Sequence, residues 1–82
     1  MSHTIYMVFE NGGTGRGKWL GTHMTETGAL ANITKRSGPV TKRWRTPLKG
    51  KDKSWWVDVI EAGEDSYYLE SEVRNTVVSK RE

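Results

Sequence analysis

Residues 54–61, SWWVDVIE, carry the strongest fold signal in the chain. Successive side chains of a β-strand point to opposite faces of the sheet, so the adjacent Trp55 and Trp56 cannot share a face. Trp55 alternates with Val57 and the next valine, which predicts that it lies in the core. Trp56 alternates with Asp58 and is the better candidate for a partly exposed aromatic platform. The segment therefore predicts a strand with one buried and one exposed tryptophan.

The segments on either side of this strand predict a meander of antiparallel strands. Residues 40–46 alternate in the same way and are expected to pair with it through a connecting loop at 47–53. Residues 62–65, AGED, predict a tight turn that leads into a strand at 66–70. Residues 71–79 form a last strand or a short helix, and their valines favour the strand.

The N-terminal third predicts a strand hairpin. Residues 4–10, TIYMVFE, have apolar side chains on both faces, with Ile5 on one and Val8 on the other, which indicates a strand with neighbours on both sides. The glycine-rich 11–17, NGGTGRG, predicts a turn or loop, because glycine at this density supplies positive φ and resists regular structure. A short strand at 18–21 is expected to pair back on the first.

One helix is predicted at residues 25–37. Thr25 is a suitable N-cap, and Glu26 lies in the first turn, where the helix dipole favours an acid. Two cations occupy the last turn, and Gly38 followed by proline ends the helix. The expected apolar stripe consists of Met24, Ala29, Leu30 and Ile33.

Together these elements predict an α+β fold, a mostly antiparallel sheet of four to five strands with one short helix packed on one face. A small half-open β-barrel is the alternative. With 82 residues the chain has room for a single small domain, residues 1–82, with flexible ends at 1–3 and 79–82.

The composition narrows the functional classes. No cysteine is present, so there is no disulfide, no cysteine-based zinc site and no thiol nucleophile. The apolar run at residues 5–9 is too short for a signal peptide or a membrane span. The sequence therefore predicts a cytoplasmic protein that needs no cofactor.

The charges are distributed unevenly along the chain. Residues 1–55 contain ten Lys and Arg against three acids, whereas residues 56–82 contain three against seven, so charges of +7 and −4 make up the net +3. Within the first part, residues 35–53 carry eight bases and one acid. This basic stretch is the clearest functional feature of the sequence.

The basic stretch and its neighbours predict a binding surface for nucleic acid. Basic groups neutralise phosphates, and aromatic faces stack on unpaired bases. Alternation places Arg43 and Arg45 on one face, whereas Trp44 shares the other face with Val40 and is expected in the core. The predicted site residues are Arg16, Lys18, Arg43, Arg45, Lys49, Lys51, Lys53 and Trp56.

Other interpretations of the same charges stay open. Lysines on an edge strand keep it soluble and block edge-to-edge pairing, and these cations can also pair with the acidic C-terminal third. An acidic protein partner is a further alternative. In size, lack of cysteine and density of tryptophan the chain resembles small accessory proteins of phages and mobile elements, which suggests an inhibitor or adaptor that docks on a larger protein in a host cytoplasm.

Motifs for catalysis or metal binding are not supported. Residues 12–18 fit G-x-x-x-x-G-K, but Trp19 stands where a P-loop has its Mg²⁺-binding Ser or Thr. His3 and His23 lie far apart and suggest no metal site. The acidic residues between 61 and 72 fit no calcium loop and are expected to form a solvated turn. No activated serine is marked, so we expect a binding protein and not an enzyme.

Overall fold

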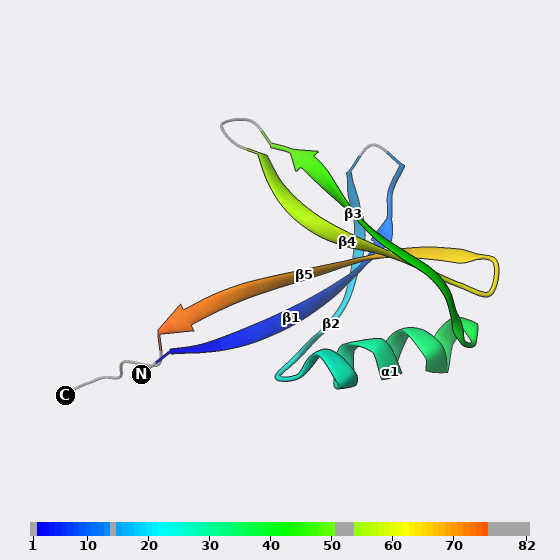
Figure 1. The fold of residues 1–82 in the computed structure, drawn as a ribbon, viewed down its shortest axis with the longest axis horizontal. Helices are drawn as coiled ribbons and strands as arrows, with labels where there is room; N and C mark the ends of the chain where they lie inside the picture. The colour runs from blue at the N-terminus through cyan, green and yellow to red at the C-terminus, as the bar shows by residue number, and fades with distance from the viewer. Residues whose placement is uncertain (1, 14, 51–53, 76–82) are drawn as a thin grey trace.

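The computed structural model describes residues 2–13, 15–50 and 54–75. It contains one antiparallel sheet and one helix (Figure 1). The elements are β1 (Ser2–Asn11), β2 (Arg16–His23), α1 (Glu26–Ser37), β3 (Val40–Lys49), β4 (Ser54–Ala62) and β5 (Asp65–Asn75). The order of the strands in the sheet is β2-β1-β5-β4-β3.

This architecture confirms the predicted α+β fold. β3, β4 and β5 form the predicted meander, and β1 pairs on both sides, with β2 and with β5. The sheet is not closed into a barrel, since β2 and β3 remain at its two edges. The barrel alternative is therefore wrong.

Two predicted element boundaries are also wrong. β3 continues through residues 47–49, which had been expected to form a loop, and Pro47 is tolerated because β3 is an edge strand. β5 runs without a break to Asn75, because it pairs with β1 from Tyr67 onward, and no separate element begins at residue 71. The predicted last element ran to residue 79, and its residues 76–79 lie outside the described residues. The same is true of Met1 and of residues 79–82, which were predicted to be flexible ends. Ser2, which was also placed in a flexible end, belongs to β1.

α1 has the ends that the sequence predicts. The Thr25 hydroxyl accepts a hydrogen bond of 3.0 Å from the backbone N–H of Gly28, and Gly38, at φ 98°, ends the helix and donates to the Thr34 carbonyl. Met24 precedes the N-cap and is exposed, so its predicted place in the apolar stripe is wrong. α1 lacks the length and apolarity to cross a membrane, and it is the one helix of the described residues.

The sheet is packed on both faces. Between α1 and the helix-side face, which α1 covers in part, lies a buried cluster of Ala29 and Ile33 from α1 with Val8, Ile60, Ala62, Tyr67 and Leu69 from the sheet. The opposite face carries a second buried cluster of Phe9, Leu48, Val57, Val59 and Tyr68, with Trp55 packed against it. The predicted assignment of Trp55 to the core is thus confirmed.

β4 and β5 diverge beyond their shared turn, and this divergence positions the candidate site. The turn contains Gly63 at φ 61°, a left-handed conformation that favours glycine. From there the two strands pair only as far as Asp58 and Leu69. Past that point β4 pairs only with β3, and β5 only with β1 (Figure 1). The β3–β4 arm and the β1–β5 arm therefore separate, beside the N-terminal end of α1.

Candidate functional site

Strand β3 gathers much of the basic stretch on one edge of the sheet. Its ten residues include four cations and no acid. Lys42, Arg43, Arg45 and Lys49 are all exposed. Lys51 and Lys53, also predicted for the site, lie outside the described residues. The edge strand thus presents a row of positive charge to solvent.

Arg45 and Trp56 are two largely exposed side chains on the helix-side face. Residues opposite each other in antiparallel strands share a face, and the register places Arg45 opposite Asp58, and Trp56 opposite Pro47. Trp56 is 61% exposed, and the Arg45 side chain is 68% exposed. The Arg45 guanidinium carbon lies 6.0 Å from the centre of the Trp56 ring. The structure confirms the predicted exposure of Trp56 and places it beside an arginine.

Arg43 is tied more firmly into the fold. Its guanidinium Nη2 lies 3.1 Å from a carboxylate oxygen of Glu26 on α1 and donates a second, short hydrogen bond to Asp58 on β4. The hydrogen bonds to Glu26 and to Asp58 raise the pKa of Arg43. Asp58 also lies 3.4 Å from the Arg45 Nε. Internal pairing, one of the alternatives left open by the sequence, therefore applies to Arg43 and in part to Arg45.

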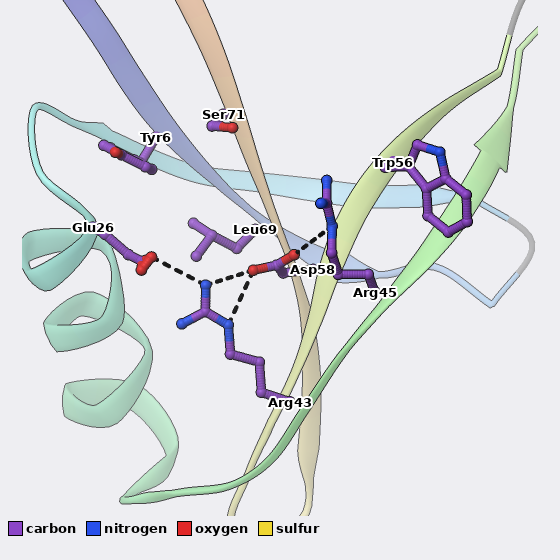
Figure 2. A pocket seen from close by; sticks show the side chains of 8 residues that line it. All are labelled: Tyr6, Glu26, Arg43, Arg45, Trp56, Asp58, Leu69 and Ser71. Atoms are coloured by element: carbon purple, nitrogen blue, oxygen red, sulfur yellow. Dashed lines mark hydrogen bonds and ion pairs between the residues drawn. The ribbon is translucent and has the colours of Figure 1, made fainter.

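A hollow of about 240 Å³ opens between these residues and the β1–β5 arm (Figure 2). Its β3–β4 side is formed by Arg43, Arg45, Trp56 and Asp58. The remaining lining residues are Tyr6, Glu26, Leu69 and Ser71. The hollow thus has an apolar part at Leu69 and Tyr6, a paired set of charges, and an exposed indole nearby.

Arg16 belongs to a different environment on the opposite face. Its guanidinium carbon lies 5.0 Å from the centre of the Phe9 ring and 5.1 Å from that of Trp55. Its Nε lies 3.3 Å from a carboxylate oxygen of Glu70. Arg16 therefore connects the start of β2 to β4 and β5 across the curled sheet. It does not join Arg45 and Trp56, and Lys18 is on β2, the edge of the sheet remote from β3.

Glu70 is the residue that the sequence placed most wrongly. It was expected in a solvated acidic turn, but its side chain is only 8% exposed. The Trp55 indole N–H donates a hydrogen bond of 3.2 Å to one carboxylate oxygen, and the other oxygen has no hydrogen-bond partner among the described residues. Burial raises the pKa of Glu70, against the opposing effects of Arg16 and of the Trp55 hydrogen bond. Glu70 follows Tyr68 by two residues on β5, so the two side chains lie on the same face of the strand, and Tyr68 is buried. This spacing was the signal in the sequence that Glu70 faces inward.

Two further tryptophans are exposed. Trp44 is 38% exposed, so its predicted burial is wrong. The register shifts between Val40 and Lys42, so Val40 lies opposite Ala62 and Trp44 opposite Val59, and the two do not share a face as predicted. β3 is also an edge strand with a neighbour on one side only, and the Lys42 ammonium lies 5.0 Å from the centre of the Trp44 ring. Trp19 on β2, which the sequence left undecided, is 57% exposed. It lies at the other edge of the sheet.

The structure gives no sign of a metal centre in residues 2–13, 15–50 and 54–75, where no three His, Asp or Glu side chains cluster as ligands. His23 lies within hydrogen-bond distance of Asn32, 3.0 Å away, and thus helps to hold α1 to β2. β2 directly follows the glycine-rich segment, so the strand–loop–helix arrangement of a P-loop is not formed there. No protein-family model matches the chain, and no curated protein or solved structure matches it either.

Proposed function

We propose that this chain is a non-enzymatic nucleic-acid-binding protein that contacts the phosphate backbone along strand β3. The observation that carries the proposal is the composition of this edge strand, which has four cations and no acid. The exposed Trp44 lies on β3 itself, and the exposed Trp56 lies on the neighbouring β4. An edge strand is open along one side, so a polyanion can approach it without displacing another strand.

The physical basis is the release of counterions. Each phosphate that a lysine or arginine neutralises frees a condensed counterion, which favours binding at low salt and weakens it at high salt. Arg43 is already paired with two carboxylates, so Lys42, Arg45 and Lys49 are the described cations of β3 best placed for phosphates. Three phosphate contacts correspond to a slope of log affinity against log salt of about −2 to −3.

Fluorescence anisotropy with labelled DNA and RNA oligonucleotides over a range of salt concentrations tests the proposal. We expect Lys49→Ala to weaken binding for every sequence and to reduce the slope by about 1. Lys35→Ala, which removes an exposed cation from α1, is the matched control and should leave the slope unchanged. The absence of binding to any single- or double-stranded oligonucleotide at low salt contradicts the proposal.

A second candidate is an inhibitor or adaptor that docks on an acidic surface of a larger protein. The contact between Arg45 and Trp56 favours it, because exposed Trp and Arg are the residue types that dominate binding hot spots. This function predicts one stoichiometric complex in a pull-down from the native host, lost in Trp56→Ala and Arg45→Ala. Capture of the same partner by both variants would rule out this surface.

A further inference from the structure

We infer that the hollow beside Trp56 receives one unpaired nucleobase, and that the preferred ligand is therefore a single strand. This inference rests on the proposed function and makes it more specific. It starts from the side chains in Figure 2, where Trp56 and Arg45 extend from the β3–β4 arm and Glu26, Tyr6 and Ser71 lie across the hollow.

The charge of the hollow argues for a base and against a phosphate inside it. Arg43 and Arg45 contribute two positive charges, which Glu26 and Asp58 balance. A phosphate placed there would meet two carboxylates, whereas a nucleobase is neutral and has hydrogen-bonding groups along its edge. The phosphates are better placed outside, along β3, near Lys49 and the exposed end of Arg45.

The accessible indole supplies the stacking surface. Trp56 is the most exposed aromatic side chain that the structure describes, and a base can stack on it only when that base is not already stacked within a duplex. Because Arg45 lies next to this ring, a nucleotide stacked on Trp56 would bring its phosphate close to a cation. The pair suits a nucleotide of a single strand.

The bound edge of the base would meet donors and acceptors that the fold holds in place. Arg43 is fixed between α1 and β4 by its contacts with Glu26 and Asp58. Each carboxylate oxygen can accept two hydrogen bonds, so Asp58 can accept from a base amino group while it remains paired with the arginines. Carboxylates accept from the amino group of cytosine, which thymine replaces with a carbonyl oxygen. The hollow should therefore favour cytosine over thymine.

The test compares the affinities of three ligands of equal length at one salt concentration: oligo(dC), oligo(dT) and a mixed-sequence duplex. For the wild-type protein we expect oligo(dC) to bind most tightly and the duplex most weakly. Trp56→Ala should weaken binding to both single strands about tenfold or more and leave the duplex affinity unchanged. Trp44→Ala, which removes a tryptophan from the opposite face of β3, is the control and should have the smaller effect on single strands.

A second variant tests the hydrogen-bonding edge separately. Asp58→Asn replaces one carboxylate oxygen by an amide donor and should abolish the preference for oligo(dC), with thermal unfolding used to verify that the protein remains folded. Equal affinities of the wild-type protein for the single strands and the duplex, with no effect of Trp56→Ala, would overturn the inference and leave the proposed phosphate contacts along β3 standing. No binding to any of the three ligands would overturn both.

Discussion

Trp55 and Trp56 are adjacent in the sequence, and each lies close to an arginine and a carboxylate. Trp55 contacts Arg16 and donates a hydrogen bond to Glu70, whereas Trp56 lies beside Arg45, which is paired with Asp58. In the first group Glu70 is buried and Trp55 is packed against the core, whereas in the second group Trp56 is mostly exposed. The same residue types therefore link strands of the sheet on one face and include a largely exposed tryptophan and arginine on the other.

This difference follows from burial and not from chemistry. Arg16, whose side chain is 41% exposed, contacts two aromatic rings and the buried Glu70 carboxylate, so it links β2 to three other strands, and a ligand would have to displace these contacts. The Trp56 and Arg45 side chains keep most of their contact with water. A ligand that replaces this water loses little existing structure.

The strongest test of the comparison is to remove each indole in turn. We expect Trp55→Ala to lower the free energy of unfolding by about 3 kcal/mol, because it opens a cavity beside the cluster of Phe9 and Tyr68 and leaves Glu70 without its donor. Trp56→Ala should change the unfolding free energy by less than about 0.5 kcal/mol. Urea denaturation of both variants measures the difference, and equal losses would contradict the assignment of the two tryptophans to different roles.

The second test concerns the pH dependence of stability. Because burial raises the pKa of Glu70, the folded protein binds this proton more tightly than the unfolded chain does. The resulting contribution to the free energy of unfolding is fully present below the pKa that Glu70 has in the unfolded chain. It is lost as the pH rises through the pKa of Glu70 in the folded protein, by about 1.4 kcal/mol for each pH unit that separates the two pKa values. The charged groups that act on this carboxyl are Arg16 and Glu72.

Glu70→Gln, which cannot titrate, is the reference for this test. We expect the wild-type stability to fall relative to that of Glu70→Gln as the pH rises from about 4, the pKa range of an ordinary glutamate, and to run parallel to it once Glu70 is ionised in the folded protein. Urea denaturation at a series of pH values gives both curves. A difference that stays constant, or that grows in favour of the wild-type protein as the pH rises, would contradict the raised pKa.

Replacement of Arg16 or Arg45 by lysine retains the charge and should change the free energy of unfolding less than Trp55→Ala does. Lysine cannot reproduce the planar contact of a guanidinium with aromatic rings. We expect Arg16→Lys to lower the unfolding free energy by about 1 kcal/mol, since Arg16 contacts Phe9 and Trp55, and Arg45→Lys to leave it nearly unchanged. A larger loss in Arg45→Lys than in Arg16→Lys, measured by thermal unfolding, would reverse the comparison.

Arg45→Ala should also change the unfolding free energy little, by no more than about 0.5 kcal/mol. On nucleic acid, however, this variant should reduce the slope of log affinity against log salt by about 1, because it removes one phosphate contact. Anisotropy titrations of both proteins over the same salt range measure the slope. An unchanged slope would remove Arg45 from the binding surface.

The sequence was sufficient to predict features that depend on neighbouring residues. Strict alternation in β4 separated Trp55 from Trp56, and the capping residues Thr25 and Gly38 defined both ends of α1. These features are local, so they follow from strand periodicity and helix capping without knowledge of the rest of the fold.

Features that depend on distant contacts could not be predicted in this way. Trp44 does not share a face with Val40 as alternation predicted, because the register shifts between Val40 and Lys42, and its exposure depends on the position of β3 at the edge of the sheet. Glu70 is buried because Arg16, from the start of β2, reaches it across the curled sheet. The pairing of Arg43 with Glu26 likewise requires α1 to lie beside β3. In each case the tertiary arrangement decides the role of the residue.

The roles of Trp55 and Trp56 are compared most directly by the tryptophan indole N–H resonances in ¹H–¹⁵N NMR spectra, recorded while oligo(dC) is added at low salt. The four tryptophans give four separate signals, assigned by single substitutions to phenylalanine. We expect the signal of Trp56 to move progressively as the ligand binds and that of Trp55 to stay in place. Movement of Trp55 without Trp56, or no movement of Trp56 at saturating ligand, would contradict the assignment of ligand binding to Trp56 and of a structural role to Trp55.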